Sequence, residues 1–222
     1  MNRTTELLEA VKAGHTARVQ ELLAADPALV NAQDESGNSA VLLAAYYGRQ
    51  LILDVLLAHD VALNVFEAAA SGNRDRVKAL VEDDPARVNA FAHDGYTPLG
   101  LASFFGHLAV AEYLVAQGAE VNRASQNKMR VMPLHSALAT RQVDIARLLI
   151  AHGAEVNVAQ QDGFTPLHEA AQNGQEDMVA LLLEHGAHID AKRDDGETAL
   201  SIAVAEGYTP IAELLRRHGA AE

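Results

Sequence analysis

The sequence predicts an all-α solenoid of about seven helix–turn–helix pairs joined by β-hairpin fingers. Segments like "DGFTPLHEAAQNG" (162–174) recur along the chain, at intervals close to the period of about 33 residues that is typical of repeat proteins. Each copy contains two apolar stretches with helical spacing, separated by one residue that is nearly always glycine. These separating residues are Gly14, Gly48, Gly72, Gly106, Arg141, Gly174 and Gly207.

The copy at 162–190 shows how one repeat is expected to fold. Asp162 and Gly163 form a tight-turn signal for the tip of a hairpin finger. Thr165 followed by Pro166 predicts a helix start, with threonine at the N-cap and proline at the first helical position. A short inner helix then ends at Gly174, and a longer outer helix follows. The predicted buried stripe of the outer helix is Met178, Val179, Leu182 and Leu183.

This pattern resembles the ankyrin repeat, whose signature T-P-L-H-x-A stands here as "TPLHEA" at 165–170. Related copies begin at Asp94 and Asp195, so the resemblance covers nearly the whole chain. It implies one solenoid domain with a cap repeat at each end. The predicted boundaries are a cap repeat at 1–33, repeats at 34–64, 65–93, 94–124, 125–161 and 162–194, and a cap repeat at 195–222.

The histidine at position 168 is predicted to be architectural. In the ankyrin family the matching histidine forms hydrogen bonds across the finger and the helix start. His135 occupies the same place one repeat earlier, whereas Leu42, Phe66, Gly100 and Ser201 occupy it elsewhere, so no catalytic role depends on it. The chain also has no glycine-rich phosphate loop, nucleophile motif or metal-ligand spacing. We therefore predict no enzyme activity, no catalytic residue, no metal and no cofactor.

Composition and charge narrow the classes of partner. The chain has 222 residues and a formal net charge of −13, which disfavours nucleic acid and anionic membrane surfaces. No apolar run is long enough for a membrane helix, and the charged N-terminus lacks the apolar core of a signal peptide. The chain has no cysteine, which excludes disulfides and thiolate metal sites. We expect a soluble, cytoplasmic monomer.

One finger is predicted to be missing near residue 64. Only 24 residues separate Gly48 from Gly72, and the chain passes from Asn64 almost directly into the next inner helix. Residues 7–64 also align with 65–122 without a gap, which suggests that the missing finger marks the junction of a duplicated two-repeat block. The gap is either purely historical or a cleft with a function, and the sequence leaves both open.

The finger at 122–135 departs from the pattern in another way. It is longer by two residues and lacks both the Asp-Gly tip and the N-cap threonine. It carries Arg123, Lys128 and Arg130 on an otherwise acidic chain. These cations suit a carboxylate or phosphate of a partner. The alternative is a solvated loop, or internal pairing of these cations with the neighbouring acidic fingers.

The resemblance implies that a partner binds in a concave groove formed by inner helices and fingers. Most of the aromatic residues, which are scarce in this chain, fall on these elements, and aromatic residues are enriched at binding hot spots. Alternatively, one residue of each adjacent pair, or Phe66, packs in the core. The predicted partner-binding residues are Tyr46, Tyr47, Phe66, Phe91, Tyr96, Phe104, Phe105, Arg130 and Phe164.

The sequence therefore predicts a non-catalytic protein-interaction module. Its acidic fingers favour a protein partner with a basic, partly apolar surface. One alternative is a small-molecule or metal-binding protein that uses the cleft at the missing finger. Another is a dedicated inhibitor or immunity partner of a neighbouring enzyme.

Overall fold

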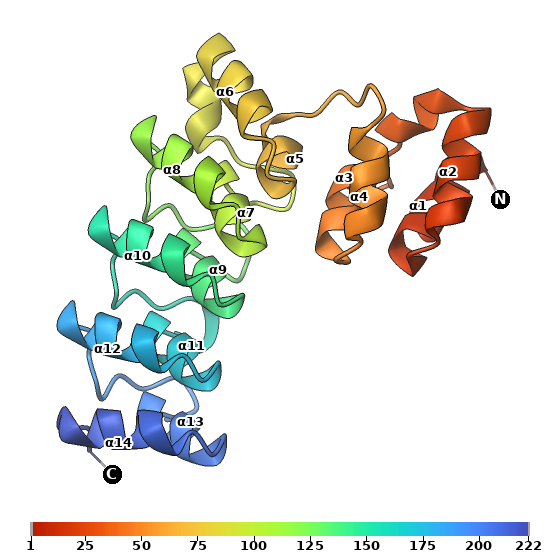
Figure 1. Cartoon of the computed structure of the whole chain (residues 1–222). Helices are drawn as coiled ribbons and strands as arrows, with labels where there is room; N and C mark the ends of the chain where they lie inside the picture. Colours follow the sequence, from red (N-terminus) through yellow and green to blue (C-terminus); the bar gives the residue numbers. More distant parts are fainter. Residues whose placement is uncertain (1, 222) are drawn as a thin grey trace. The chain divides into compact units, whose positions relative to one another are not determined.

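The chain folds into a series of helix–turn–helix pairs (Figure 1). The computed structural model describes residues 2–221, and this part contains fourteen α-helices in seven pairs. It divides into two compact units, one ending at Arg87 and the other beginning at Val88. The predicted all-α solenoid of about seven pairs is confirmed.

The first unit holds the first three pairs. Within it the inner helices pack in a row, α1 against α3 and α3 against α5. The outer helices α2 and α4 pack against each other. Short 3₁₀ turns at Pro27–Asn31 and Pro85–Asn89 follow the outer helices of the first and third pairs. The turn at Pro85–Asn89 contains the boundary between the two units. The helices are α1 (Arg3–Ala13), α2 (Thr16–Ala25), α3 (Ala40–Tyr46), α4 (Gln50–Leu57), α5 (Val65–Ala70) and α6 (Arg74–Asp83).

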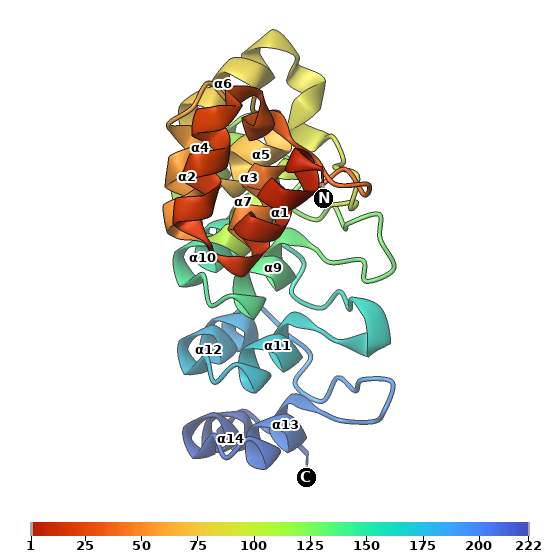
Figure 2. The same ribbon diagram turned by 90° about the vertical axis from the view of Figure 1, so that its right-hand side faces the viewer.

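The second unit holds the remaining four pairs. Its inner helices form one row, in which each packs against the next, and fingers project to one side of the helices (Figure 2). A 3₁₀ turn at Gln161–Gly163 forms the tip of one finger. The helices are α7 (Pro98–Phe105), α8 (Leu108–Ala116), α9 (Pro133–Ala139), α10 (Val143–Ala151), α11 (Pro166–Gln172), α12 (Glu176–Glu184), α13 (Ala199–Ala205) and α14 (Thr209–Arg217).

The turn inside each helix pair requires a left-handed backbone. The residue at this turn has a positive φ in all seven pairs, including φ 60° at Arg141, the one position that lacks glycine. Three of the turn glycines, Gly14, Gly106 and Gly174, also lie close to the next repeat, whereas a Cβ atom on Gly48 or Gly207 would meet nothing within 4 Å. A Cβ atom on Gly174 would come within 2.9 Å of the Tyr208 ring. Gly14, Gly106 and Gly174 therefore serve both the backbone geometry of the turn and the close packing of the next repeat.

The core follows the helical period that the sequence indicates. In α12 Met178, Val179 and Leu182 are fully buried, as predicted. Leu183 is only half-buried, so it lies at the edge of the stripe rather than within it. Fully burying a leucine side chain contributes roughly 1.5–3 kcal/mol. This apolar seam is therefore a principal source of stability for the sixth pair.

The fingers are hairpin-shaped loops rather than β-hairpins with strands. Gln160 N–H donates to Phe164 O at 2.9 Å, and the other fingers close in a similar way. Among the described residues the only β pairing is an isolated bridge between Gln33 and Ser39. Two short strands without further partners are marginally stable in water, which explains why the expected strands do not extend.

The missing finger near residue 64 is confirmed, because residues 59–64 run without a hairpin into α5. The Asn64 side chain accepts from Phe66 N at 2.9 Å and from Glu67 N at 3.0 Å, and Glu67 Oε2 accepts from Asn64 N at 2.8 Å. This reciprocal capping box replaces the threonine cap. Glu67, the third residue of α5, therefore has the capping role that His168 has as the third residue of α11. Phe66 matches His168 only when residues are counted from the turn.

Candidate protein-interaction surface

His168 holds two repeats together. Its ring is fully buried, its Nδ1 accepts from Thr165 N at 3.1 Å, and its Nε2 lies 3.0 Å from Ala191 O in the next finger. Burial lowers the pKa of the imidazole, which favours the neutral ring. A neutral, fully bonded and buried histidine has no free group for chemistry, so the architectural prediction is confirmed.

His135 occupies the matching place without the matching bonds. It is 1% exposed, and its ring faces the backbone of Val158 and Phe164 in the next finger without a well-aligned hydrogen bond at either nitrogen. Burial lowers its pKa to about 4. The residue at the N-cap here is Met132, which gives α9 no side-chain cap. The repeat therefore keeps the histidine but has lost the hydroxyl that orients it.

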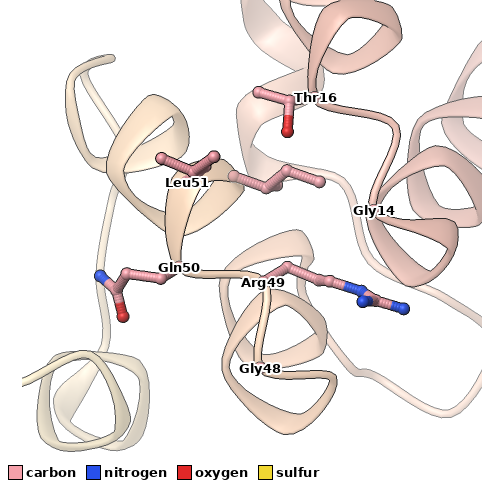
Figure 3. Close-up of a pocket in the computed structure, with 7 residues that line it drawn as sticks. Gly14, Thr16, Gly48, Arg49, Gln50 and Leu51 are labelled. Carbon is pink, nitrogen blue, oxygen red and sulfur yellow. The ribbon is translucent and has the colours of Figure 1, made fainter.

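The clearest exposed aromatics of the first unit lie at the end of α3. Tyr46 is 38% and Tyr47 is 50% exposed, and Leu51 at the start of α4 is 71% exposed. Beside them is a pocket of about 290 Å³ between the turns of the first two pairs (Figure 3). Arg49 extends across it and donates from Nη2 to Lys12 O at 2.9 Å. Phe66, by contrast, is half-buried in α5.

The predicted aromatics of the second unit are all half-buried. Phe104 and Phe105 pack edge to face, with ring centroids 5.1 Å apart. The Arg123 guanidinium lies 4.5 Å from the centroid of the Phe91 ring. Burial raises the pKa of the Tyr96 hydroxyl. These rings therefore pack with intramolecular neighbours and offer only part of their surface to a partner.

The long finger is ordered by its own polar side chains. Ser125 Oγ donates to Asn127 Oδ1 at 2.9 Å, and Asn127 Nδ2 donates to Asp94 O in the preceding finger at 3.0 Å. Arg123 pairs with Glu120 at 2.7 Å, so internal pairing explains this cation. Lys128 and Arg130 remain exposed, as does Met129 at 50%.

A second pocket lies at three successive fingers of this unit and was not predicted. It has a volume of about 350 Å³, and Phe164 is the only predicted site residue among those that line it. Glu169 projects into it from α11, with Oε1 accepting from Asn173 Nδ2 at 2.9 Å. The signal was present in the sequence, because a carboxylate stands here where other repeats carry Leu101 or Ile202.

The part of the chain that the structure describes shows neither a metal-binding cluster nor a membrane-spanning helix. No group of three or more His, Cys, Asp or Glu within residues 2–221 is placed to hold a metal ion. In the same range, no helix is both long and apolar enough to cross a membrane. The two pockets above lie away from residues 59–64, so they give no support to ligand binding at the missing finger.

The chain is similar to several curated proteins. It is 32% identical over 114 residues to alpha-latrocrustotoxin-Lt1a of Latrodectus tredecimguttatus, covering 47% of this chain and 8% of that protein. It is 30% identical over 129 residues to protein VAPYRIN-LIKE of Medicago truncatula, covering 54% and 28% respectively. Human ankyrin repeat domain-containing protein 49 is 42% identical over 55 residues, covering 24% and 23%. The chain thus spans less than a third of the length of each of these relatives.

A family model described as ankyrin repeats in three copies matches residues 63–125 and 134–221, well over half of the chain. The second of these ranges contains the Thr165 and His168 pair and its hydrogen bonds to the next finger. Sequence register, helix pairing and the histidine tether agree. The chain belongs to the ankyrin-repeat family.

Proposed function

We propose that the chain is a non-catalytic module that binds a partner protein through its fingers and inner helices. Ankyrin repeats are generally protein–protein interaction modules, and the family is generally non-enzymatic. The observation that carries the proposal for this chain is the exposure of Tyr46 and Tyr47, at 38% and 50%. Aromatic side chains on a rigid scaffold supply contact area at a low entropic cost, which favours binding.

The proposed partner has a basic and partly apolar surface. The net charge of −13 produces a field that attracts a basic protein and repels nucleic acid. We place the contacts at the exposed tyrosines, at the half-buried rings of the second unit and at Arg130. The proposal includes a cytoplasmic, monomeric chain.

Affinity capture from host lysate tests this function. The baits are the wild-type chain, a Tyr46→Ala/Tyr47→Ala variant and an Arg147→Ala control, since Arg147 is exposed but lies on the outer helix α10, away from the fingers and inner helices. We expect a protein that the wild type and the control retain and the tyrosine variant loses. Truncation of a hot-spot residue costs roughly 2 kcal/mol or more of binding free energy.

Two results would count against the proposal. Equal capture by all three baits places the contact elsewhere and removes the tyrosines from the site. No captured protein with any bait argues against a protein partner under those growth conditions. The identity of a captured protein also shows whether it is an enzyme, as the inhibitor or immunity alternative requires.

A further inference from the structure

The pocket at the three successive fingers of the second unit combines a carboxylate with apolar walls. Met129 comes from the finger before α9, Phe164 from the finger before α11, and Arg193 from the finger before α13. Glu169 and Gln172 come from the inner helix α11 itself. The pocket therefore lies where three fingers meet an inner helix.

Glu169 stands at a position where the neighbouring repeats bury apolar or small side chains. Counted from the turn inside each pair, the matching residues of the second unit are Leu101, Ser136 and Ile202. Their side chains are 2%, 1% and 4% exposed, respectively. A carboxylate at this position loses water without gaining apolar contacts. Packing of the repeat therefore does not explain the choice of glutamate.

The charge of Glu169 has no cation against it. Its two oxygens accept only from amides, Asn173 Nδ2 at 2.9 Å and Gln160 Nε2 at 3.4 Å. None of the ion pairs within residues 2–221 involves Glu169. Burial raises the pKa of its carboxyl group, as expected for a partly desolvated anion that lacks a counter-ion. A cation from outside the chain would supply the missing interaction.

The remaining walls suit the stem of a long basic side chain. The Phe164 ring and the exposed thioether chain of Met129 provide apolar surface next to the carboxylate. Arg193 is the one cation in the lining, but its guanidinium already pairs with Asp195 and Glu197, each at 3.1 Å, and covers part of the Phe164 ring, 5.0 Å from the ring centroid. Its charge is therefore offset, and Asp162 at the rim adds a further negative charge.

We propose that this pocket receives one lysine or arginine side chain of the partner protein, with the ammonium or guanidinium group on the Glu169 carboxylate and the aliphatic stem against Phe164 and Met129. The inference rests on the proposed function and specifies the chemistry of the partner at this point. Lysine and arginine bury their stems on apolar surface while the charged end finds an anion.

The test is an NMR titration of the full, ¹⁵N-labelled chain with three capped pentapeptides that carry a central lysine, arginine or norleucine. We expect the lysine or arginine peptide to shift the backbone amides of residues 160–173, and the neutral norleucine peptide to leave them unchanged. Glu169→Gln should weaken this binding by about tenfold or more. Glu176→Gln, a matched change on the exposed face of α12, should have no effect.

A Glu169→Leu variant separates binding from folding. Leucine restores the apolar residue of the neighbouring repeats, so we expect a higher melting temperature together with loss of the peptide-induced shifts. A lower melting temperature would show that the carboxylate has a structural role and would overturn the proposal. Equal shifts with the norleucine peptide, or binding that survives Glu169→Gln, would overturn it as well.

The two proposals fail in different ways. A protein captured equally by wild type and by Glu169→Gln removes the basic-side-chain pocket but leaves the interaction module intact. Peptide shifts that depend on Glu169, in a chain that captures no protein, support the pocket and count against the module.

Discussion

The hydroxyl of Thr165 lies 2.8 Å from Nδ1 of His168, and this contact aligns the ring so that Nε2 reaches Ala191 O. One repeat earlier, Met132 replaces the threonine, and the ring of His135 faces the backbone of Val158 and Phe164 without a well-aligned hydrogen bond. The repeat without the N-cap threonine therefore has a buried ring with only poorly aligned polar contacts, where the next repeat has a well-formed tether.

Met132→Thr should stabilise the chain. The hydroxyl would cap α9 and give Nδ1 of His135 a partner, each of which is worth about 1 kcal/mol. We expect the free energy of unfolding to rise by about 1 kcal/mol after the loss of the half-buried methionine is included. Urea denaturation measures the change. Thr165→Met is the reverse control, and an unchanged midpoint for Met132→Thr would show that the ring cannot use the new hydroxyl.

His135 should make stability fall in mild acid. Its pKa is lowered from 6.5 to about 4 in the folded chain, so the unfolded chain binds the proton more tightly. The stability that depends on the neutral ring is complete above pH 6.5 and is lost as the pH falls to about 4. The shift corresponds to about 3 kcal/mol.

Urea denaturation across this pH range measures the effect. His135→Gln should flatten the dependence of the unfolding free energy on pH relative to wild type, whereas the exposed His93→Gln should not. A slope that is the same in all three chains would show that other groups cause the acid sensitivity.

The register of the repeat was enough to predict the helix pairs, the turn at Arg141 and the missing finger, because each depends on local backbone preferences and spacing. Side-chain partners were less predictable. Relative to its turn glycine, α5 begins one residue later than α11 does, so Glu67 rather than Phe66 caps the helix. Counting residues back from the turn glycine does not reveal this shift. The pocket at Glu169 depends on three fingers coming together, and no single repeat contains that information.

Arg141→Gly should stabilise the turn of the fifth pair. Arg141 is exposed and has φ 60°, a conformation that costs a non-glycine residue roughly 1–2 kcal/mol. Glycine removes this cost but adds entropy to the unfolded chain, so we expect a net gain of about 0.5–1 kcal/mol.

Thermal unfolding monitored by circular dichroism tests the glycine substitution. Gly174→Ala is the opposite control and should destabilise, because its Cβ atom would lie 2.9 Å from the Tyr208 ring at a left-handed position. A lower melting temperature for Arg141→Gly would mean that the arginine side chain contributes more than the backbone costs.

Asn64→Ala should destabilise the junction at the missing finger. Asn31, Asn89, Asn122 and Asn157 each accept from a backbone N–H about 31 residues further on, whereas the Asn64 side chain caps α5 instead. Loss of an N-cap costs about 0.5–2 kcal/mol, because the backbone amides of Phe66 and Glu67 lose their acceptor, whereas the Glu67 carboxylate keeps the backbone N–H of residue 64.

Hydrogen exchange locates this effect. Amides of α5 should lose protection in Asn64→Ala, while those of α11 keep it. An Asn31→Ala control removes a tether between repeats without touching the cap, so it should leave the first turn of α5 protected. Uniform loss of protection in both variants would indicate global destabilisation rather than a local capping effect.

Stability measurements also decide whether the exposed tyrosines belong to a binding surface or to the core. Leu182 is fully buried in α12, so Leu182→Ala should cost roughly 2–5 kcal/mol. Tyr46 is 38% exposed, and surface substitutions usually change stability by less than about 0.5 kcal/mol. We therefore expect Tyr46→Ala to keep the urea midpoint of wild type. If Tyr46→Ala destabilises as much as Leu182→Ala, the ring holds the repeats together, and its exposure is no evidence for a partner.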